Sequence, residues 1–317
     1  MSNSWHIKNW FRVGKQFSWN LSFNTLCGLL ALNKSGDCFL IRHADKKHEF
    51  ILDFLEREFS GLIEEYKNVE EAKSSEYSNA IWTVWWTGRE SAPPLVKACL
   101  ESIERNANGR ELIVLSKDNI KEYIELPEYI IALQKSGKMS MANMCDLIRV
   151  MLLSEYGGLW LDSTIFAGHE IPKDLFKEPF YSLHTKYSHN CYVQHNLYHI
   201  FVLGSIKGGK LVSFVRDLFL EYWKRYDVII DYFLLDYTLA VAYRNFPDIR
   251  EEIDNLEYTS ERLYDMVNVL SLPYDEGEFI ELCSSCLFSK LDWHRKYKEQ
   301  SKGQITLFSH VIGQMQH

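Results

Sequence analysis

Three charged residues near the middle of the sequence have spacings that would let them act on one ligand. Asp146 and Arg149 are three residues apart, so they share a face if this segment is helical. Asp162 follows inside the apolar run 159–166, where a carboxylate needs a compensating partner because burying an unpaired charge is costly. The three residues are therefore a candidate binding site, although Asp146 and Arg149 alone could form an ordinary helical ion pair.

The chemistry open to these side chains is the binding of sugar hydroxyls and of phosphate. A carboxylate and a guanidinium fixed on one helix can hydrogen-bond sugar hydroxyls with a defined geometry. A nucleotide diphosphate needs a divalent cation or strong cationic donors, and hard cations prefer carboxylate oxygens such as those of Asp162. The residue types therefore point to a phosphorylated sugar or a sugar nucleotide.

The elements that must position these residues alternate between strand and helix. The apolar and β-branched runs predict strands at 80–86, 111–115, 159–166, 180–183 and 200–206. Apolar residues at helical spacing predict helices at 50–66, 93–103, 140–157, 211–223 and 228–243. Ser140 is a suitable N-cap, and Gly157-Gly158 a suitable helix end. Strand and helix in alternation predict an α/β fold with a parallel sheet and crossover helices.

Two blocks of the sequence resemble a known family. SMANMCDLIR at 140–149 and YGGLWLDST at 156–164 resemble the "SDxxR…yGGxYxDxD" signature of glycosyltransferases with a DXD-containing sugar-binding region. That group is similar to the clostridial glucosylating toxins. The closest likeness is to its bacterial capsular polysaccharide synthesis proteins, which often carry a GGxWLDxT version. Residues 81–93 also resemble that family's first strand and helix, so the likeness covers roughly residues 78–172.

The resemblance implies a GT-A-type nucleotide-diphospho-sugar transferase fold, with a mixed, mostly parallel sheet flanked by helices. It implies transfer of a hexose from a UDP-sugar to a saccharide acceptor, expected to be lipid-linked, in the synthesis of a capsule or another surface polysaccharide. The wider superfamily suggests that the anomeric configuration is retained. The expected cofactor is a divalent metal, Mn²⁺ or Mg²⁺.

The resemblance also assigns a donor site. Its implied members are Trp85, Asp146, Arg149, Ser163 and Thr164. Trp85 would stack on the uracil, Asp146 and Arg149 would hold the donor sugar, and Asp162 would lie at the metal and the diphosphate. For Trp85 the alternative is a core aromatic side chain in the run 82–86.

The sequence departs from the motif at its second acidic position, which is Thr164. A hydroxyl is a much weaker ligand for Mn²⁺ or Mg²⁺ than a carboxylate. In GT-A enzymes a residue near the C-terminus often closes the donor site, so Ser309 and His310 are candidates, with Asp162 and His310 as the expected metal ligands. The alternative is a non-catalytic subunit that binds a sugar nucleotide or a polysaccharide with a decayed GT-A fold.

Acceptor residues are expected in the second half of the chain. Asp231 and Asp236 lie five apart on the predicted helix 228–243, so only one is expected to face the site, and Asp236 is preferred. A carboxylate there could be the general base of an inverting enzyme or orient the acceptor in a retaining one. His184 is an acceptor candidate, and the histidines around it lack the ligand pattern of a zinc site. A hydrolase using Asp162 and Asp236 lacks the usual paired-carboxylate context.

Composition limits the location and partners. The net charge of −8 disfavours wholesale nucleic-acid binding, and the seven scattered cysteines suit reduced thiols in a cytoplasmic protein. No run is long and apolar enough to predict a membrane span, and the N-terminus does not resemble a signal peptide. The CxxC pair Cys283 and Cys286 has no second pair to complete a zinc site.

The chain is expected to have two regions. Residues 1–75 form an aromatic and helical extension, and residues 76–317 form the transferase domain, with acceptor-side helices from about 207. Tryptophan and phenylalanine alternate with lysine and arginine over residues 1–40, a composition that suits the membrane–water boundary. This segment could therefore contact the inner face of the cell membrane, or it could simply pack on the core.

Overall fold

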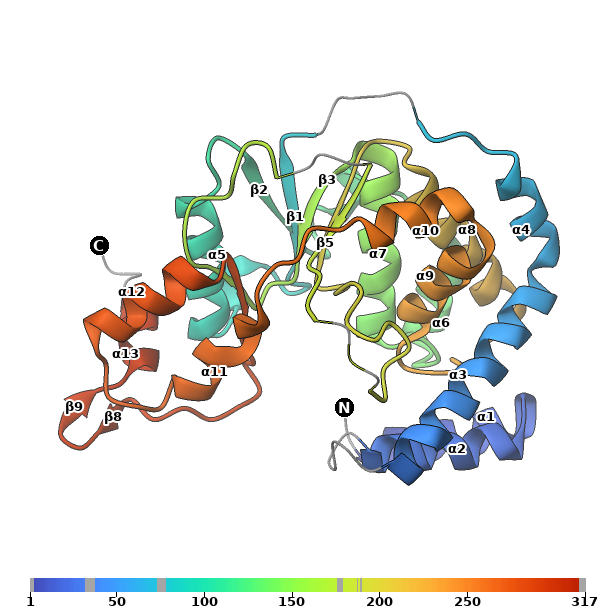
Figure 1. Ribbon diagram of the computed structural model, residues 1–317, viewed down its shortest axis with the longest axis horizontal. Helices are drawn as coiled ribbons and strands as arrows, with labels where there is room; N and C mark the ends of the chain where they lie inside the picture. Colours follow the sequence, from blue (N-terminus) through green and yellow to red (C-terminus); the bar gives the residue numbers. More distant parts are fainter. Residues whose placement is uncertain are drawn as a thin grey trace.

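The computed structural model describes residues 3–31, 38–72, 78–175, 179–186, 188 and 190–313. A five-stranded sheet lies between helices, with the N-terminal helices at one end of the molecule and the C-terminal helices at the other (Figure 1). Within these residues no helix combines the length and the apolar character that crossing a membrane requires.

The central sheet has the strand order β2-β1-β3-β6-β5. Its strands are β1 (Ala80–Val84), β2 (Glu111–Leu115), β3 (Gly158–Leu161), β5 (Phe180–Ser182) and β6 (Val202–Ser205). β1 is parallel to β2 and β3, whereas β6 is antiparallel to its neighbours β3 and β5. All strands except β6 therefore run in one direction, and the predicted α/β class with a mixed, mostly parallel sheet flanked by helices is confirmed.

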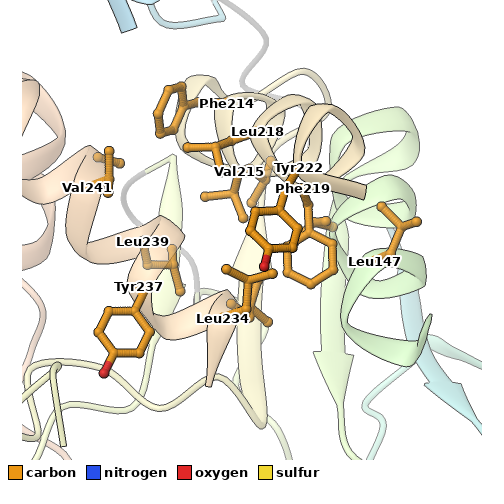
Figure 2. Packing of buried hydrophobic residues seen from close by; sticks show 14 of the residues in the cluster. Leu147, Phe214, Val215, Leu218, Phe219, Tyr222, Leu234, Tyr237, Leu239 and Val241 are labelled. Atoms are coloured by element: carbon orange, nitrogen blue, oxygen red, sulfur yellow. The ribbon is translucent and has the colours of Figure 1, made fainter. Parts of the chain in front are cut away.

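Helices cover both faces of this sheet. They are α5 (Pro94–Arg105), α6 (Glu128–Lys135), α7 (Met141–Tyr156), α8 (Lys210–Arg225), α9 (Leu234–Asn245) and α10 (Pro247–Asp254). Trp82 and Trp160 belong to the core cluster of α7, α8 and α9, whereas Ile81 and Leu159 belong to a second cluster that includes Ile103 of α5. Figure 2 shows α8 and α9 packed together near α7. Because both faces are covered, every residue of β1 and β3 is buried, which explains why these strands are nearly continuous apolar runs in the sequence.

The N-terminal helices are part of the main core. They are α1 (Asn3–Gln16), α2 (Trp19–Ala31), α3 (Cys38–Glu58) and α4 (Ser60–Lys67). Val13, Leu21, Ile51 and Phe59 are buried in the same cluster as residues of α8 and α9. The buried side of this extension therefore packs on the rest of the protein, and any membrane contact must use its exposed side.

The C-terminal region builds a second, smaller layer. It contains η3 (Glu261–Tyr264), α11 (Asp265–Val269), α12 (Glu276–Ser285), β7 (Phe288–Lys290), β8 (Gln300–Ser301), β9 (Gln304–Ile305) and α13 (Leu307–Gly313). β7 pairs antiparallel with β4 (Ile165–Ala167), and α5 packs against β4 and α13. The short 3-10 helices η1 (Arg89–Ser91) and η2 (Ile120–Glu122) lie in loops of the first half. The cysteines Cys283 and Cys286 of this region are free thiols.

Two predicted elements differ from the structure. The run 159–166 is not one strand: β3 ends at Leu161, the chain turns at residues 162–164, and β4 then joins a different sheet. The turn brings Asp162 to the edge of the sheet, where cations can reach it. The predicted helix 228–243 begins only at Leu234, because the Asp231 carboxylate accepts the backbone N–H of Phe233 at 2.9 Å and favours a turn there.

Candidate functional site

The carboxyl ends of the parallel strands β1 and β3 open into a cleft of about 810 Å³. β1 continues into Trp85 and Trp86, and β3 continues into Asp162, Ser163 and Thr164, all of which line the cleft. Ligands of open α/β sheets bind at this edge, where loops carry side chains from a rigid frame. The volume lies within the range of small-molecule sites, roughly 300–1,000 Å³.

Specific residues fix both ends of α7, the helix that carries two of the predicted site residues. At its start the Ser140 hydroxyl accepts the backbone N–H of Asn143 at 3.2 Å, which confirms the predicted N-cap. At its end Gly157 and Gly158 have φ values of 69° and 99°. A Cβ atom at either glycine would lie 2.6 Å from a backbone atom of another strand or loop. The chain can therefore pass from α7 straight into β3 only with glycine at both positions.

Arg149 connects α7 to β3 through a buried charged network. Its Nη2 lies 3.1 Å from Oδ1 of Asp162 and 3.4 Å from Oδ1 of Asp146. Its Nη1 donates to the backbone carbonyl of Ile200 at 2.6 Å, and the guanidinium lies 4.9 Å from the ring of Trp160. The structure therefore brings the three charged residues predicted from the sequence together, with the arginine between the two carboxylates.

Asp162 has a second cationic neighbour, Lys290 of β7. The Lys290 ammonium donates to Oδ2 of Asp162 at 2.7 Å and to the hydroxyl of Thr164 at 2.9 Å, while Trp160 Nε1 donates to Oδ1 at 2.9 Å. Burial, the largest influence, raises the pKa of Asp162, but Lys290 and Arg149 together outweigh it and leave that pKa below its ordinary value. Asp162 is therefore a fixed anion at neutral pH.

Two other carboxyl groups of the cleft behave differently. Burial raises the pKa of Asp146 to about 6, although the charge of Arg149 opposes the shift. Burial also raises the pKa of Asp236 to about 8, and the negative charge of Asp146 adds to this effect. Oδ2 of Asp236 is buried with no hydrogen-bond partner in the described part of the chain. Asp236 is thus largely protonated at pH 7 and is a group that can hold or release a proton at the cleft.

The tryptophan of β1 and the two that follow this strand lie in different surroundings. Trp82 is a core residue, because its Nε1 donates to the carbonyl of Gly157 at 2.8 Å inside the fold. Trp85 and Trp86 line the cleft. The ring of Trp85 meets that of Trp293 edge to face, with 5.5 Å between their centres. The aromatic side chains of the cleft are Trp85, Trp86, Trp160, Phe201, Tyr232, Phe233, Tyr264 and Trp293. They offer faces on which a base or a sugar ring can stack.

The structure places two acceptor candidates outside the residues that line this cleft. Asp231 lies in the loop before α9, and its Oδ2 forms a buried ion pair with Lys47 of α3 at 3.1 Å. His184 has its Nδ1 2.9 Å from the carbonyl oxygen of Leu256 and forms an isolated bridge beyond the end of β5. Both contacts join separate elements of the fold, so these residues have structural roles in the described arrangement. Asp236, the preferred member of the aspartate pair, does line the cleft.

The expected divalent metal site does not fit the side chains that are present. His310 stacks on Tyr274 with 3.8 Å between ring centres, and neither it nor Ser309 is among the residues that line the cleft. Both carboxylate oxygens of Asp162 already accept hydrogen bonds from protein donors. Over the described ranges no three His, Cys, Asp or Glu side chains are grouped closely enough to hold a metal ion.

Sequence reasoning missed Lys290 and the loop that follows it. Lys290, Asp292, Trp293, His294 and Arg295 all line the cleft, although they are far along the chain from β3. The available signal was a lone lysine inside the apolar run 287–291, which is the same anomaly that marked Asp162. The C-terminal region contributes to the lining of the cleft through β7 and the loop after it, and not through α13, which carries Ser309 and His310.

Comparison with known proteins identifies the family of this chain. A solved structure described as the PaToxG glycosyltransferase is similar over 67% of this chain and 83% of its own chain, at 11% sequence identity and a TM-score of 0.41. Among curated proteins none matches this chain. The family model described as capsular polysaccharide synthesis protein matches residues 39–311, which is most of the sequence. The chain therefore belongs to the capsular polysaccharide synthesis protein family.

Proposed function

We propose that this protein is a glycosyltransferase that transfers a hexose from a UDP-sugar to a saccharide acceptor during synthesis of a capsule or another surface polysaccharide. The observation that carries the proposal is the charged network of Arg149, Asp162 and Lys290 at the floor of an aromatic cleft. Charged donors suit a diphosphate, and aromatic faces suit a base or a sugar ring. The capsular polysaccharide synthesis family supports the same conclusion.

In this proposal the donor nucleotide lies over the carboxyl ends of β1 and β3. Trp85 stacks on the uracil, since its ring lines the cleft where β1 ends. Asp146 and Arg149 bind the hydroxyls of the donor sugar from the rigid helix α7. Ser163 and Thr164, in the turn after β3, lie next to the phosphates. Each of these side chains borders the same cavity, so one ligand can contact them together.

The acceptor occupies the side of the cleft that contains Asp236, and we expect it to be a lipid-linked saccharide. In the transfer step the bond between the anomeric carbon and the donor phosphate oxygen breaks, and both electrons stay with UDP. The acceptor oxygen forms the new bond to that carbon from the same face that UDP leaves, so that the configuration is kept, and its proton passes to the ionised carboxylate of Asp236, which lies on that side of the cleft. We propose that the anomeric configuration is retained, which proton NMR of the first-formed product would show.

The test is release of UDP from a panel of UDP-sugars by the purified full chain, with and without Mn²⁺. We expect turnover of one UDP-sugar and a loss of about a hundredfold or more in Asp162→Asn, because that carboxylate holds both cations of the floor. Asp174→Asn, an exposed turn residue outside the cleft, is the matched control and should retain full activity.

The other outcomes of this assay are equally informative. UDP binding without turnover of any UDP-sugar would favour the non-catalytic binding subunit. Failure to bind UDP under any condition would contradict the proposed donor. Full activity in Asp162→Asn would remove Asp162 from the catalytic machinery and leave the rest of the proposal in place.

We further propose that the protein works on the cytoplasmic face of the cell membrane, where a lipid-linked acceptor would be available. The support is an apolar surface on α1 and α2. Phe11, Trp19, Phe23 and Leu26 are between 46% and 55% exposed there, although large apolar side chains are usually buried. Aromatic side chains of this kind favour the headgroup boundary of a bilayer.

A further inference from the structure

The pairing of β4 with β7 places a lysine at the DXD-like turn. Lys290 lies opposite Ile165 in this antiparallel pair, and the next residue, Leu291, donates its backbone N–H to the carbonyl of Thr164 at 2.9 Å. The backbone of β7 is thus fixed beside the turn after Asp162. As a result the Lys290 ammonium bridges Asp162 and Thr164, the two positions of the motif at which metal ligands are expected.

The charges around this bridge suit an ammonium better than a divalent cation. Asp146 and Asp162 are balanced by Arg149 and Lys290, so these four side chains have no net charge when all are ionised. A hard cation instead needs several oxygen ligands with surplus negative charge. Any metal ion at Asp162 would also lie beside two fixed positive charges, which repel it.

We propose that the Lys290 ammonium takes the place of the divalent cation and binds the diphosphate of the donor nucleotide, so that donor binding needs no metal. The inference rests on the proposed function, since it assumes a nucleoside diphosphate in this cleft. An ammonium has three N–H donors, and Asp162 and Thr164 use two of them. The Lys290 side chain is 21% exposed, so the third can reach a phosphate oxygen from the cleft.

The loop after β7 adds donors on the same side. His294 and Arg295 line the cleft next to Lys290, and Arg295 is held by Asp292 at 3.2 Å. A diphosphate bound to Lys290 would therefore face further N–H groups from one continuous segment, including the guanidinium of Arg295. No comparable set of carboxylates faces the ammonium, because Asp162 is its only acidic partner among the described residues.

The experiment measures UDP binding by calorimetry in EDTA and in MnCl₂, using the full chain. We expect the wild-type Kd to agree within about twofold between the two buffers, and Lys290→Met to weaken UDP about tenfold to a hundredfold in both, as for loss of one charge-assisted hydrogen bond. Lys290→Arg should keep most of the affinity because it restores the charge. Lys296→Met, an exposed lysine outside the cleft, is the control and should bind like wild type.

Binding of uridine, measured by ligand-observed NMR, distinguishes the loss of a diphosphate contact from general damage to the binding site. Uridine binding should be unchanged in Lys290→Met, because the base does not contact the ammonium. Equal losses for UDP and uridine would overturn the inference, as would wild-type UDP binding that EDTA abolishes and Mn²⁺ restores. The latter result would leave the proposed function standing, whereas absence of UDP binding in every buffer would contradict that function itself. If Lys290→Met does not fold, the inference is still tested by wild-type UDP binding in EDTA and in Mn²⁺ and by UDP binding of Lys290→Arg.

Discussion

Three aspartates at the cleft have different ionisation because their neighbours differ. Asp162 lies between two cations and stays ionised, whereas Asp236 is buried, its Oδ2 has no hydrogen-bond partner among the described residues, and its pKa rises to about 8. Asp146 is intermediate, with a pKa raised to about 6 by burial. Carboxyl groups whose environments separate their pKa values in this way can divide the tasks of fixed charge and proton transfer.

Asp236→Asn tests the proton-accepting role. Only ionised Asp236 can take the acceptor proton, so wild-type kcat/KM should rise with pH and level off above about 8. The asparagine variant should lose roughly a hundredfold or more in rate and also lose this rising limb. Steady-state kinetics from pH 6 to 9.5 provide the measurement. A variant that keeps the limb would assign it to another group.

The pH dependence of the unfolding free energy gives a second test with the same variant. Asp236 ionises near its ordinary pKa of 3.8 in the unfolded chain but near 8 in the fold. Between these values the folded state binds more protons, so this residue makes the wild type less stable as pH rises from about 4 to 8. Asparagine cannot ionise, so the unfolding free energy of the variant should vary less over that interval. Steeper dependence in the variant would contradict the burial of this carboxyl group.

At the scale of elements, the connection between α7 and β3 decides how Arg149 meets Asp162. Gly158→Ala should destabilise the protein by about 1–3 kcal/mol or more, because φ is 99° and the added Cβ would lie 2.6 Å from the carbonyl oxygen of Ala80. Urea denaturation measures the change. Gly61→Ala in α4 is the control: nothing lies within 4 Å of its Cβ, so helix propensity should stabilise it by up to about 1 kcal/mol. Equal effects of both substitutions would refute the argument.

This connection is also the part of the fold that the sequence predicted best. The N-cap at Ser140, the helix end at Gly157 and the proximity of Arg149 to Asp162 all follow from contacts between residues close in the chain. Helix caps and turns depend on local backbone geometry, which residue types such as serine and glycine report directly. The alternation of strand and helix was predictable for the same reason.

Contacts between distant segments could not be predicted in this way. The pairing of β4 with β7 joins segments far apart in sequence, and nothing near Thr164 indicates that Lys290 will lie beside it. The division of the run 159–166 depends on that pairing too, since β4 leaves the main sheet to join β7. His310 was expected at the site from the family resemblance, but α13 packs against α5 instead.

At the scale of the whole molecule, α1 and α2 form a surface that exposes large apolar side chains. The exposed rings of Phe11 and Phe23 lie on these helices, at the opposite end of the molecule from α12 (Figure 1). Val13 and Leu21 of the same helices are buried in the main core. We propose that this apolar face inserts into the bilayer while the buried residues of the same helices keep it attached to the core.

Replacing both phenylalanines tests this surface. The double substitution Phe11→Ser and Phe23→Ser should weaken binding to phosphatidylglycerol and phosphatidylethanolamine vesicles about tenfold or more, because less apolar area leaves water. Co-sedimentation with vesicles provides the measurement. Ile280→Ser is the control, since Ile280 is 59% exposed on α12 at the other end. Equal binding by wild type and the double variant would exclude this face as the point of attachment.

The separation of Asp162 from Lys290 along the chain has a consequence for biosynthesis. The floor of the cleft comes from residues up to 164, but its second cation and the adjoining wall come from residues 290–295. Ribosomes add about 5–20 residues per second, so many seconds pass between translation of the two halves. During that interval the nascent chain exposes Asp162 without the lysine that pairs with it. A polypeptide still on the ribosome should therefore lack the cation that we propose for the donor diphosphate.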